Sequence, residues 1–161
     1  MNEQGTLNVT APRAVLDTNT VLDMLLFEDV AALPLVHAIE SEALRWLGTA
    51  RMREEVAGVL RRPRMGRWAP PERADRVLVF LDRWMQCHPA PLGPQAPRCR
   101  DTADQVFIDL AWSLSAEWLL TRDKALLKLA RPSLARGIQV RTPAAWVAAI
   151  ANHHAAADVK G

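Results

Sequence analysis

Two aspartates follow short apolar segments of the chain. Asp17 comes directly after Ala-Val-Leu in AVLDTNT, and Asp123 closes the segment LLTRD. If both segments are strands of a parallel sheet, their carboxyl ends meet at the edge where such sheets bind ligands. Aspartate also caps helices, and for each of these residues taken alone capping is the favoured interpretation. Taken together, the two aspartates indicate a shared acidic crevice.

Helical periodicity places two further acids. In a predicted helix over residues 49–62 the apolar residues recur on one face, Glu54 points nearly opposite that face, and Glu55 lies at its edge. In a predicted helix over residues 103–116, Asp104 borders the apolar face. The alternatives are an ordinary boundary glutamate and an acid that the helix dipole favours in the first turn whether or not it has a function.

A cluster of carboxylates needs a cation. The candidates, expected on one side of the sheet, are Asp17, Glu55, Asp104 and Asp123. Unpaired, they would repel one another and raise one another's pKa values, and a divalent cation removes that cost. Because the ligands are all oxygen, with no histidine or cysteine at ligand spacing, the expected ion is Mg²⁺ or Mn²⁺. Such a site activates water for attack on phosphorus.

Alternating short apolar segments and helices must position these acids. Strand candidates span residues 13–16, 44–47, 118–121 and 138–141. Helical patterns span residues 20–27, 33–43, 49–62, 72–85, 103–116, 124–130 and 143–151. This alternation predicts an α/β fold with a mainly parallel central sheet.

Length and composition describe one globular domain. The chain has 161 residues, of which 50% are hydrophobic and 24% charged, and its net charge is +2. We expect a flexible N-terminus over 1–12, a single domain over 13–148 and a flexible tail over 149–161. No signal peptide, membrane-spanning run, zinc motif or disulfide framework is evident. These features favour a cytoplasmic protein with reduced thiols and disfavour secretion and membrane insertion.

Four motifs follow one another along the chain: AVLDTNTVLD, REEVAGVLRRP, RDTADQVFIDLA and WLLTRDKALL. In this order they resemble the PIN-domain nucleases, and within them the branch described as toxin components of type II toxin–antitoxin systems. The resemblance runs from about Arg13 to Trp146. A single D-T-N after a strand occurs by chance, whereas four motifs carrying the acids selected above are specific. The resemblance implies a three-layer α/β/α sandwich.

Carried over position by position, the resemblance implies roles for individual residues. Asp17, Asp104 and Asp123 would bind the metal, and Glu55, in the family's E-x-x-x-x-L-x-x-P pattern, would complete its shell or orient the water. Supporting roles fall on Asn19 in the first loop, on Thr121 through a hydrogen bond within the site, and on Asp101 as an auxiliary acid. The family often has further acids where this chain has Ala103 and Gln105, which puts a second metal in doubt.

The activity that this resemblance implies is that of a metal-dependent endoribonuclease. Hydrolysis would proceed by in-line attack of an activated water and leave a 5′-phosphate and a 3′-hydroxyl. The family also implies an antitoxin protein as partner and often a homodimer. Candidates for the dimer surface, which core packing explains equally well, are Leu25, Leu26, Phe27 and Leu33.

Arginines near the acids are candidates for binding the RNA backbone. Arg62 and Arg64 flank Pro63 in a loop that leads to Trp68, and Arg122 is next to Asp123. One interpretation is a phosphate clamp with an aromatic platform for an unpaired base. The other, equally favoured for this loop, is a solvated segment with Trp68 packed on the core.

Two rival functions remain open. A haloacid-dehalogenase-like phosphatase also begins with an aspartate after a strand, but its D-x-D-x-T motif needs a second carboxylate where this chain has Asn19, which does not transfer protons in that role. The second rival is a non-catalytic PIN module that binds RNA or an antitoxin without cutting. The presence of all the acids argues against it.

Overall fold

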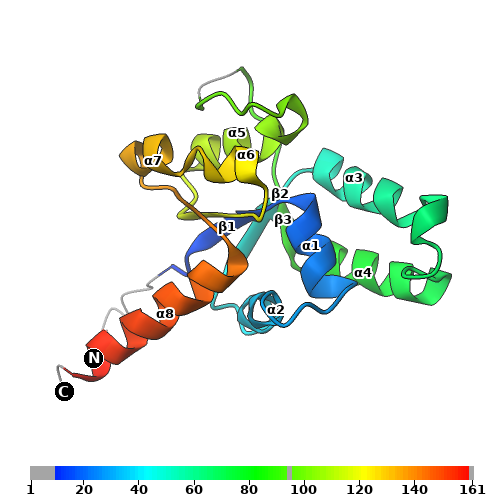
Figure 1. Ribbon diagram of the computed structural model, residues 1–161, viewed down its shortest axis with the longest axis horizontal. Helices are drawn as coiled ribbons and strands as arrows, with labels where there is room; N and C mark the ends of the chain where they lie inside the picture. The colour runs from blue at the N-terminus through cyan, green and yellow to red at the C-terminus, as the bar shows by residue number, and fades with distance from the viewer. Residues whose placement is uncertain (1–9, 94–95, 160–161) are drawn as a thin grey trace, which may run out of the picture.

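The computed structural model describes residues 10–93 and 96–159. At its centre is a sheet of five strands, all parallel, in the order β3-β2-β1-β4-β5 (Figure 1). The strands are β1 (Arg13–Leu16), β2 (Arg45–Gly48), β3 (Met85–Cys87), β4 (Trp118–Leu120) and β5 (Gln139–Arg141). Strand β1 is at the centre of the sheet. Strands β2 and β3 lie on one side of it and β4 and β5 on the other, so the strand order changes direction at β1. Such a switch point is where open α/β sheets bind ligands.

Helices cover both faces of the sheet. They are α1 (Thr18–Leu25), α2 (Leu33–Glu40), α3 (Ala50–Leu60), α4 (Pro71–Trp84), α5 (Gln105–Leu114), α6 (Lys124–Leu127), α7 (Ala130–Ser133) and α8 (Pro143–Asp158). Three short 3₁₀ turns are η1 (Pro63–Met65), η2 (Thr102–Asp104) and η3 (Leu134–Arg136). Figure 1 shows α5, α6 and α7 on one side of the sheet and α1 to α4 on the other, with α8 extending away from the body. The fold is a three-layer α/β/α sandwich.

Alternating strand residues divide the interior into two cores. Successive side chains of a strand point to opposite faces, so Leu16 packs with helices α1 to α4 and α8, whereas Val15 packs with α5 to α7. The same alternation separates Trp46 from Leu47 on β2. Because both faces are covered, the central strands are buried and apolar after the arginines that begin β1 and β2, as is typical of parallel sheets.

The structure corrects three expectations about secondary structure. Residues 85–87 form the edge strand β3, where the sequence pattern predicts the end of a helix followed by a loop. Helix α8 continues to Asp158, so most of the segment 149–161 assigned above to a tail is helical. The helix predicted over 103–116 begins with the 3₁₀ turn η2, and α5 itself starts at Gln105. Residues 1–9 of the predicted N-terminal segment lie outside the described residues.

Across the described part of the chain, none of the helices combines the length and the apolar character that crossing a membrane requires.

Candidate functional site

Asp17 lies at the carboxyl end of β1 and is 4% exposed. Its Oδ1 accepts a hydrogen bond from the Thr20 backbone N–H at 2.8 Å, which caps α1. Its Oδ2 accepts one from the hydroxyl of Thr121 at 2.5 Å. Asp17 is therefore both the helix cap that the sequence favours for it alone and a buried acid at the edge of the sheet.

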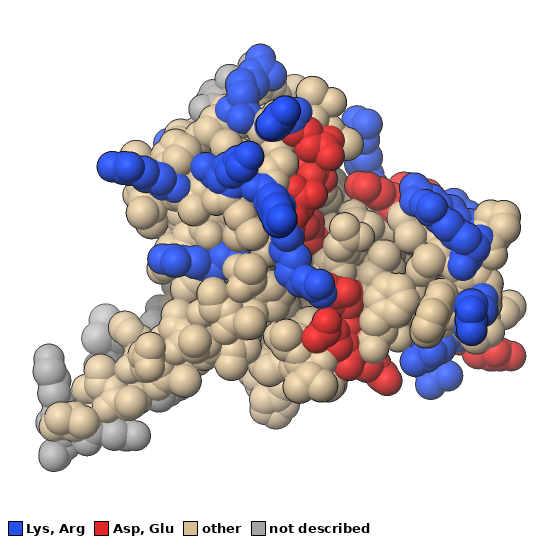
Figure 2. All heavy atoms as spheres, viewed as in Figure 1, with Lys and Arg blue, Asp and Glu red and all other residues tan. Residues whose placement is uncertain are grey.

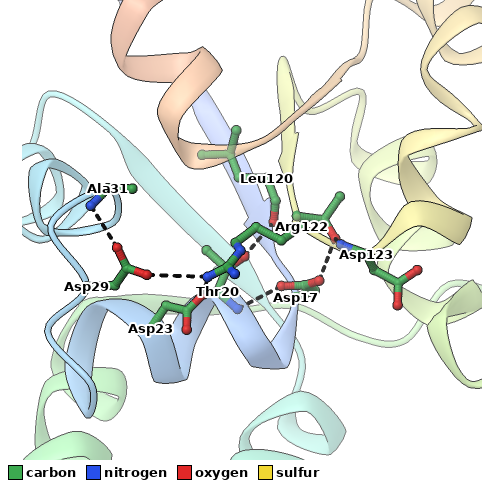
Figure 3. A network of polar contacts seen from close by, with 9 residues as sticks. Asp17, Thr20, Asp23, Asp29, Ala31, Leu120, Arg122 and Asp123 are labelled. Carbon is green, nitrogen blue, oxygen red and sulfur yellow. Dashed lines mark hydrogen bonds and ion pairs between the residues drawn. The ribbon is translucent and has the colours of Figure 1, made fainter.

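Thr121 and Asp123 follow the neighbouring strand β4. The Thr121 hydroxyl accepts a hydrogen bond from the Asp123 backbone N–H at 2.9 Å, so one buried side chain links the loop of Asp123 to Asp17. Asp123 Oδ1 in turn accepts from the Ala125 N–H at 2.7 Å and caps α6. This leaves Oδ2 of Asp123 outside the capping interactions, and Figure 3 shows that the carboxylate points away from Asp17.

The third element of the site is η2, which carries Asp101 and Asp104. Asp101, Asp104 and Asp123 each offer a carboxylate oxygen within 4.8 Å of the others. Asp101 is exposed and caps η2 by accepting a hydrogen bond from the Ala103 N–H at 3.0 Å, while Asp104 is half-buried. These three carboxylates thus meet around η2 and the end of β4. The buried Asp17 is not in this group of three and is connected to it through Thr121.

Asp104 is the acid that burial and charge perturb most clearly. Burial, then the neighbouring charges of Asp123 and Asp101, raise the pKa of Asp104 to about 7. Its Oδ2 is buried and has no hydrogen-bond partner. Burial also raises the pKa of Asp17, although hydrogen bonds from Thr121 and Thr20 oppose the shift. An oxygen without a partner amid carboxylates is the arrangement that a divalent cation stabilises.

Two hollows adjoin this acidic group. One, of about 530 Å³, is lined by Asn19, Asp23, Phe27, Arg122, Asp123 and Lys124. The other, also about 530 Å³, lies between α3, the segment after β3 and α5, and its lining includes Glu55, Ala103 and Asp109. Glu55 is exposed and is not among the acids that approach within 4.8 Å of one another, so the structure does not bring it into the group as the periodicity suggested.

The predicted cationic residues lie on separate elements. Arg122 Nη1 contacts the carboxylates of Asp23 at 3.0 Å and Asp29 at 3.3 Å, which ties the loop after β4 to α1 and to the turn that follows it (Figure 3). Arg62 and Arg64 are exposed at η1, beyond the end of α3. Figure 2 shows acidic side chains in a band with basic side chains on either side.

Some residues of the site were not anticipated from the sequence. An N-cap aspartate accepts a hydrogen bond from the backbone N–H three residues later, and Thr20 is at that position relative to Asp17. The backbone contact of Thr20 was therefore predictable from the local sequence. Its hydroxyl also donates to the Leu120 carbonyl at 3.2 Å, which joins α1 to β4. The ion pairs of Arg122 with Asp23 and Asp29 could not be predicted from local sequence, because nearly one hundred residues separate the arginine from the two acids.

The fold and this acidic edge agree with the comparison to known families. A family profile described as PIN domain matches residues 13–125 of the chain. The chain belongs to the PIN domain family, whose members are generally nucleases, and its acidic cluster has the composition of a metal site. No curated protein matches the chain.

Proposed function

We propose that this protein is a metal-dependent endoribonuclease that hydrolyses RNA phosphodiester bonds, and that it is the toxin of a toxin–antitoxin pair. The observation that carries the nuclease proposal is the buried, unpartnered Oδ2 of Asp104 beside Asp101 and Asp123, in a chain of the PIN domain family. The toxin role and an antitoxin partner rest on the resemblance of the four sequence motifs alone.

The proposed ligands are Asp104 and Asp123, with Asp101 as the third carboxylate in reach. Asp17 is assigned to the same centre because it raises the pKa of Asp104 by its charge and is fixed by Thr121. Mg²⁺ or Mn²⁺ bound there would lower the pKa of a water and offset the charge that develops on the phosphate. We assign no residue as a single general base.

The residues around the centre would position the substrate. Asp17 and Asp123 are held rigid, the first by two hydrogen bonds to its carboxylate and the second as the cap of α6, so neither acid has to be reorganised when RNA binds. Arg122 uses only Nη1 for Asp23 and Asp29, and its side chain is 59% exposed, which leaves Nη2 for a phosphate. Arg62 and Arg64 would contact the backbone further along.

Titration calorimetry with Mn²⁺ and with Mg²⁺ tests the centre directly. Asp17→Asn and Asp104→Asn remove a charge and keep the shape, while Asp75→Asn changes an exposed aspartate of α4 and serves as the control. We expect binding to the wild type and the control, and loss in both site variants.

Cleavage of single-stranded RNA in the presence of the metal, with the same variants, tests the reaction. Activity in the wild type and its loss in Asp104→Asn support the proposal. If the wild type binds no metal even with RNA present, the metal-nuclease proposal is wrong, and a non-catalytic PIN module becomes the better description.

A further inference from the structure

Two aromatic side chains meet at the surface beside the acidic group. Phe27 follows α1 and Trp68 follows η1, and their ring centroids lie 6.0 Å apart in an edge-to-face arrangement with an interplanar angle of 73°. Despite this contact, Phe27 is 43% exposed and Trp68 is 48% exposed. Trp68 is therefore not tucked into the core, and a pair of large rings remains open to solvent, which is typical of a binding surface.

The pair adjoins the proposed metal centre. Phe27 lines the hollow of about 530 Å³ that Asp123 and Asn19 also line, and Trp68 contacts the ring of Phe27. A ligand whose reactive group sat at Asp123 would thus reach Phe27 first and Trp68 next.

Trp68 has cationic neighbours, whereas Phe27 is followed by the exposed Glu28 and lines its hollow with both acidic and basic residues. The guanidinium of Arg67 lies 5.3 Å from the centroid of the Trp68 ring. Arg61, Arg62 and Arg64 are exposed nearby in the sequence, and among the described residues none of these arginines has a carboxylate within ion-pair distance. Exposed rings among unpaired arginines match the bases and phosphates of a single-stranded nucleic acid.

We propose that Phe27 and Trp68 form a stacking platform for an unpaired base of a single-stranded RNA, one or a few nucleotides from the phosphate held at the acidic group. The proposal rests on the nuclease function above and adds the residues that would select an unpaired substrate. A base stacks on an aromatic face whatever its identity, so this platform selects single strands over duplexes and gives little sequence preference.

The chain contains a matched control for the platform. Trp84 at the end of α4 also has an aromatic neighbour, Phe80, at 6.3 Å, and an arginine, Arg83, at 5.0 Å. It lines a different hollow, with Thr10, Glu42 and Arg45, which contains none of the acids of the proposed centre. Trp68→Ala and Trp84→Ala therefore remove the same side chain from beside a phenylalanine and an arginine, and only Trp68 lies beside the site. Trp84 is the more buried of the two, because it packs against the core.

The experiment measures binding of a fluorescently labelled, short single-stranded RNA by anisotropy, in chelator so that no cleavage occurs, over a range of salt concentrations. We expect Trp68→Ala to weaken binding about tenfold and Trp68→Phe to retain most of it. Since no charge is removed, the slope of log affinity against log salt should stay that of the wild type. Trp84→Ala should bind as the wild type does, and circular dichroism confirms folding of every variant.

A second probe identifies the interaction as stacking. A series of RNA oligomers carries one abasic site, placed at a different position in each. For the wild type, we expect one of these positions to weaken binding. For Trp68→Ala, the abasic site at that same position should not change the affinity. Equal affinity of Trp68→Ala and wild type overturns the platform, while metal-dependent cleavage by the wild type still stands or falls separately. A change in self-association with unchanged RNA affinity also overturns it, since the pair would then be a protein contact.

Discussion

Thr121 holds Asp17 from the neighbouring strand: its hydroxyl donates to Oδ2 of Asp17 across 2.5 Å, although 104 residues separate the two in the chain. The hydroxyl oxygen of Thr121 also accepts a hydrogen bond from the backbone N–H of Asp123. Strands β1 and β4 are paired, so this bond forms where both of them end. One buried hydroxyl therefore fixes the relative position of two acids of the proposed metal centre.

Replacing Thr121 tests that relationship. Thr121→Val keeps the shape and removes the hydroxyl, which leaves a buried carboxylate with one partner fewer. We expect the free energy of unfolding to fall by about 1–3 kcal/mol and Mn²⁺ affinity to fall about tenfold, as for other residues that orient a ligand. Thr121→Ser restores the hydroxyl and should recover both quantities in denaturation and calorimetry. Equal losses in Ser and Val would contradict this account, because Thr121→Ser keeps the hydroxyl that the hydrogen bond needs.

The raised pKa of Asp104 makes stability depend on pH in the metal-free protein. The folded state holds its proton up to about pH 7, whereas the unfolded chain releases it near the ordinary value of 3.8. The folded state therefore binds more protons between these values, so the contribution of Asp104 to stability is fully present below about pH 4 and is lost as pH rises through 7.

Asp104→Asn removes this dependence. In chelator at pH 8, we expect the variant to melt roughly 2–4 °C above the wild type, from about 1 kcal/mol after allowing for solvent around a half-buried group. At about pH 4 the two should melt together, and the difference should grow as the pH rises toward 7. Mn²⁺ at pH 8 should reverse the order, because it stabilises only the protein that binds it. A variant less stable than the wild type at pH 8 in chelator would contradict the assignment.

Several strands were predictable from local sequence, because a strand that is buried on both faces appears as a short run of apolar residues. The apolar segments that became β1, β2 and β4 are covered by helices on each side. Strand β3 was missed because it is a three-residue edge strand with Gln86 and Cys87 exposed, and Met85 continues the periodicity of α4. The far end of α8 was missed because it is exposed and alanine-rich, so helix propensity alone, without an apolar face, indicates it.

The site shows the same division. Asp17 and Asp123 were placed by the rule for strand ends, and helix periodicity placed Asp104 at a boundary. The sequence did not indicate that Asp101 lies as close to the centre as Asp104 and Asp123. Asp101 caps η2, and a capping residue carries no local signal that its carboxylate is also within 4.8 Å of two other acids. The pairing of Phe27 with Trp68 depends on how α1 and η1 pack, which no spacing in the sequence encodes.

We expect the arginines at η1 to contribute to RNA affinity through their charge and to contribute little to the stability of the fold. Arg62 and Arg64 are exposed and lie at a 3₁₀ turn with no buried residue, so the double change Arg62→Ala with Arg64→Ala should leave stability within about 0.5 kcal/mol. RNA affinity should fall and its salt dependence should flatten, because fewer counterions are released on binding. Anisotropy at several salt concentrations measures both. An unchanged slope would remove these residues from the RNA-binding surface.

Glu55 provides the sharpest test of the sequence resemblance, because the structure leaves its side chain exposed on α3 and outside the group of three aspartates. It lines the hollow that Ala103 of η2 also lines, so it faces the chain segment that carries Asp101 and Asp104. If Glu55 completes the centre when RNA and metal bind, Glu55→Gln should lower the cleavage rate at least about tenfold, the range of a general acid–base or orienting group.

The neighbouring glutamate is the control for this change. Glu54 lines the same hollow, but its carboxylate lies 3.4 Å from the guanidinium of Arg53, so it is already engaged at the surface. Glu54→Gln should cleave as the wild type does, and both variants should retain its melting temperature, since exposed charges contribute little to stability. Equal cleavage by the two variants would show that Glu55 matches the family pattern in sequence but takes no part in the reaction.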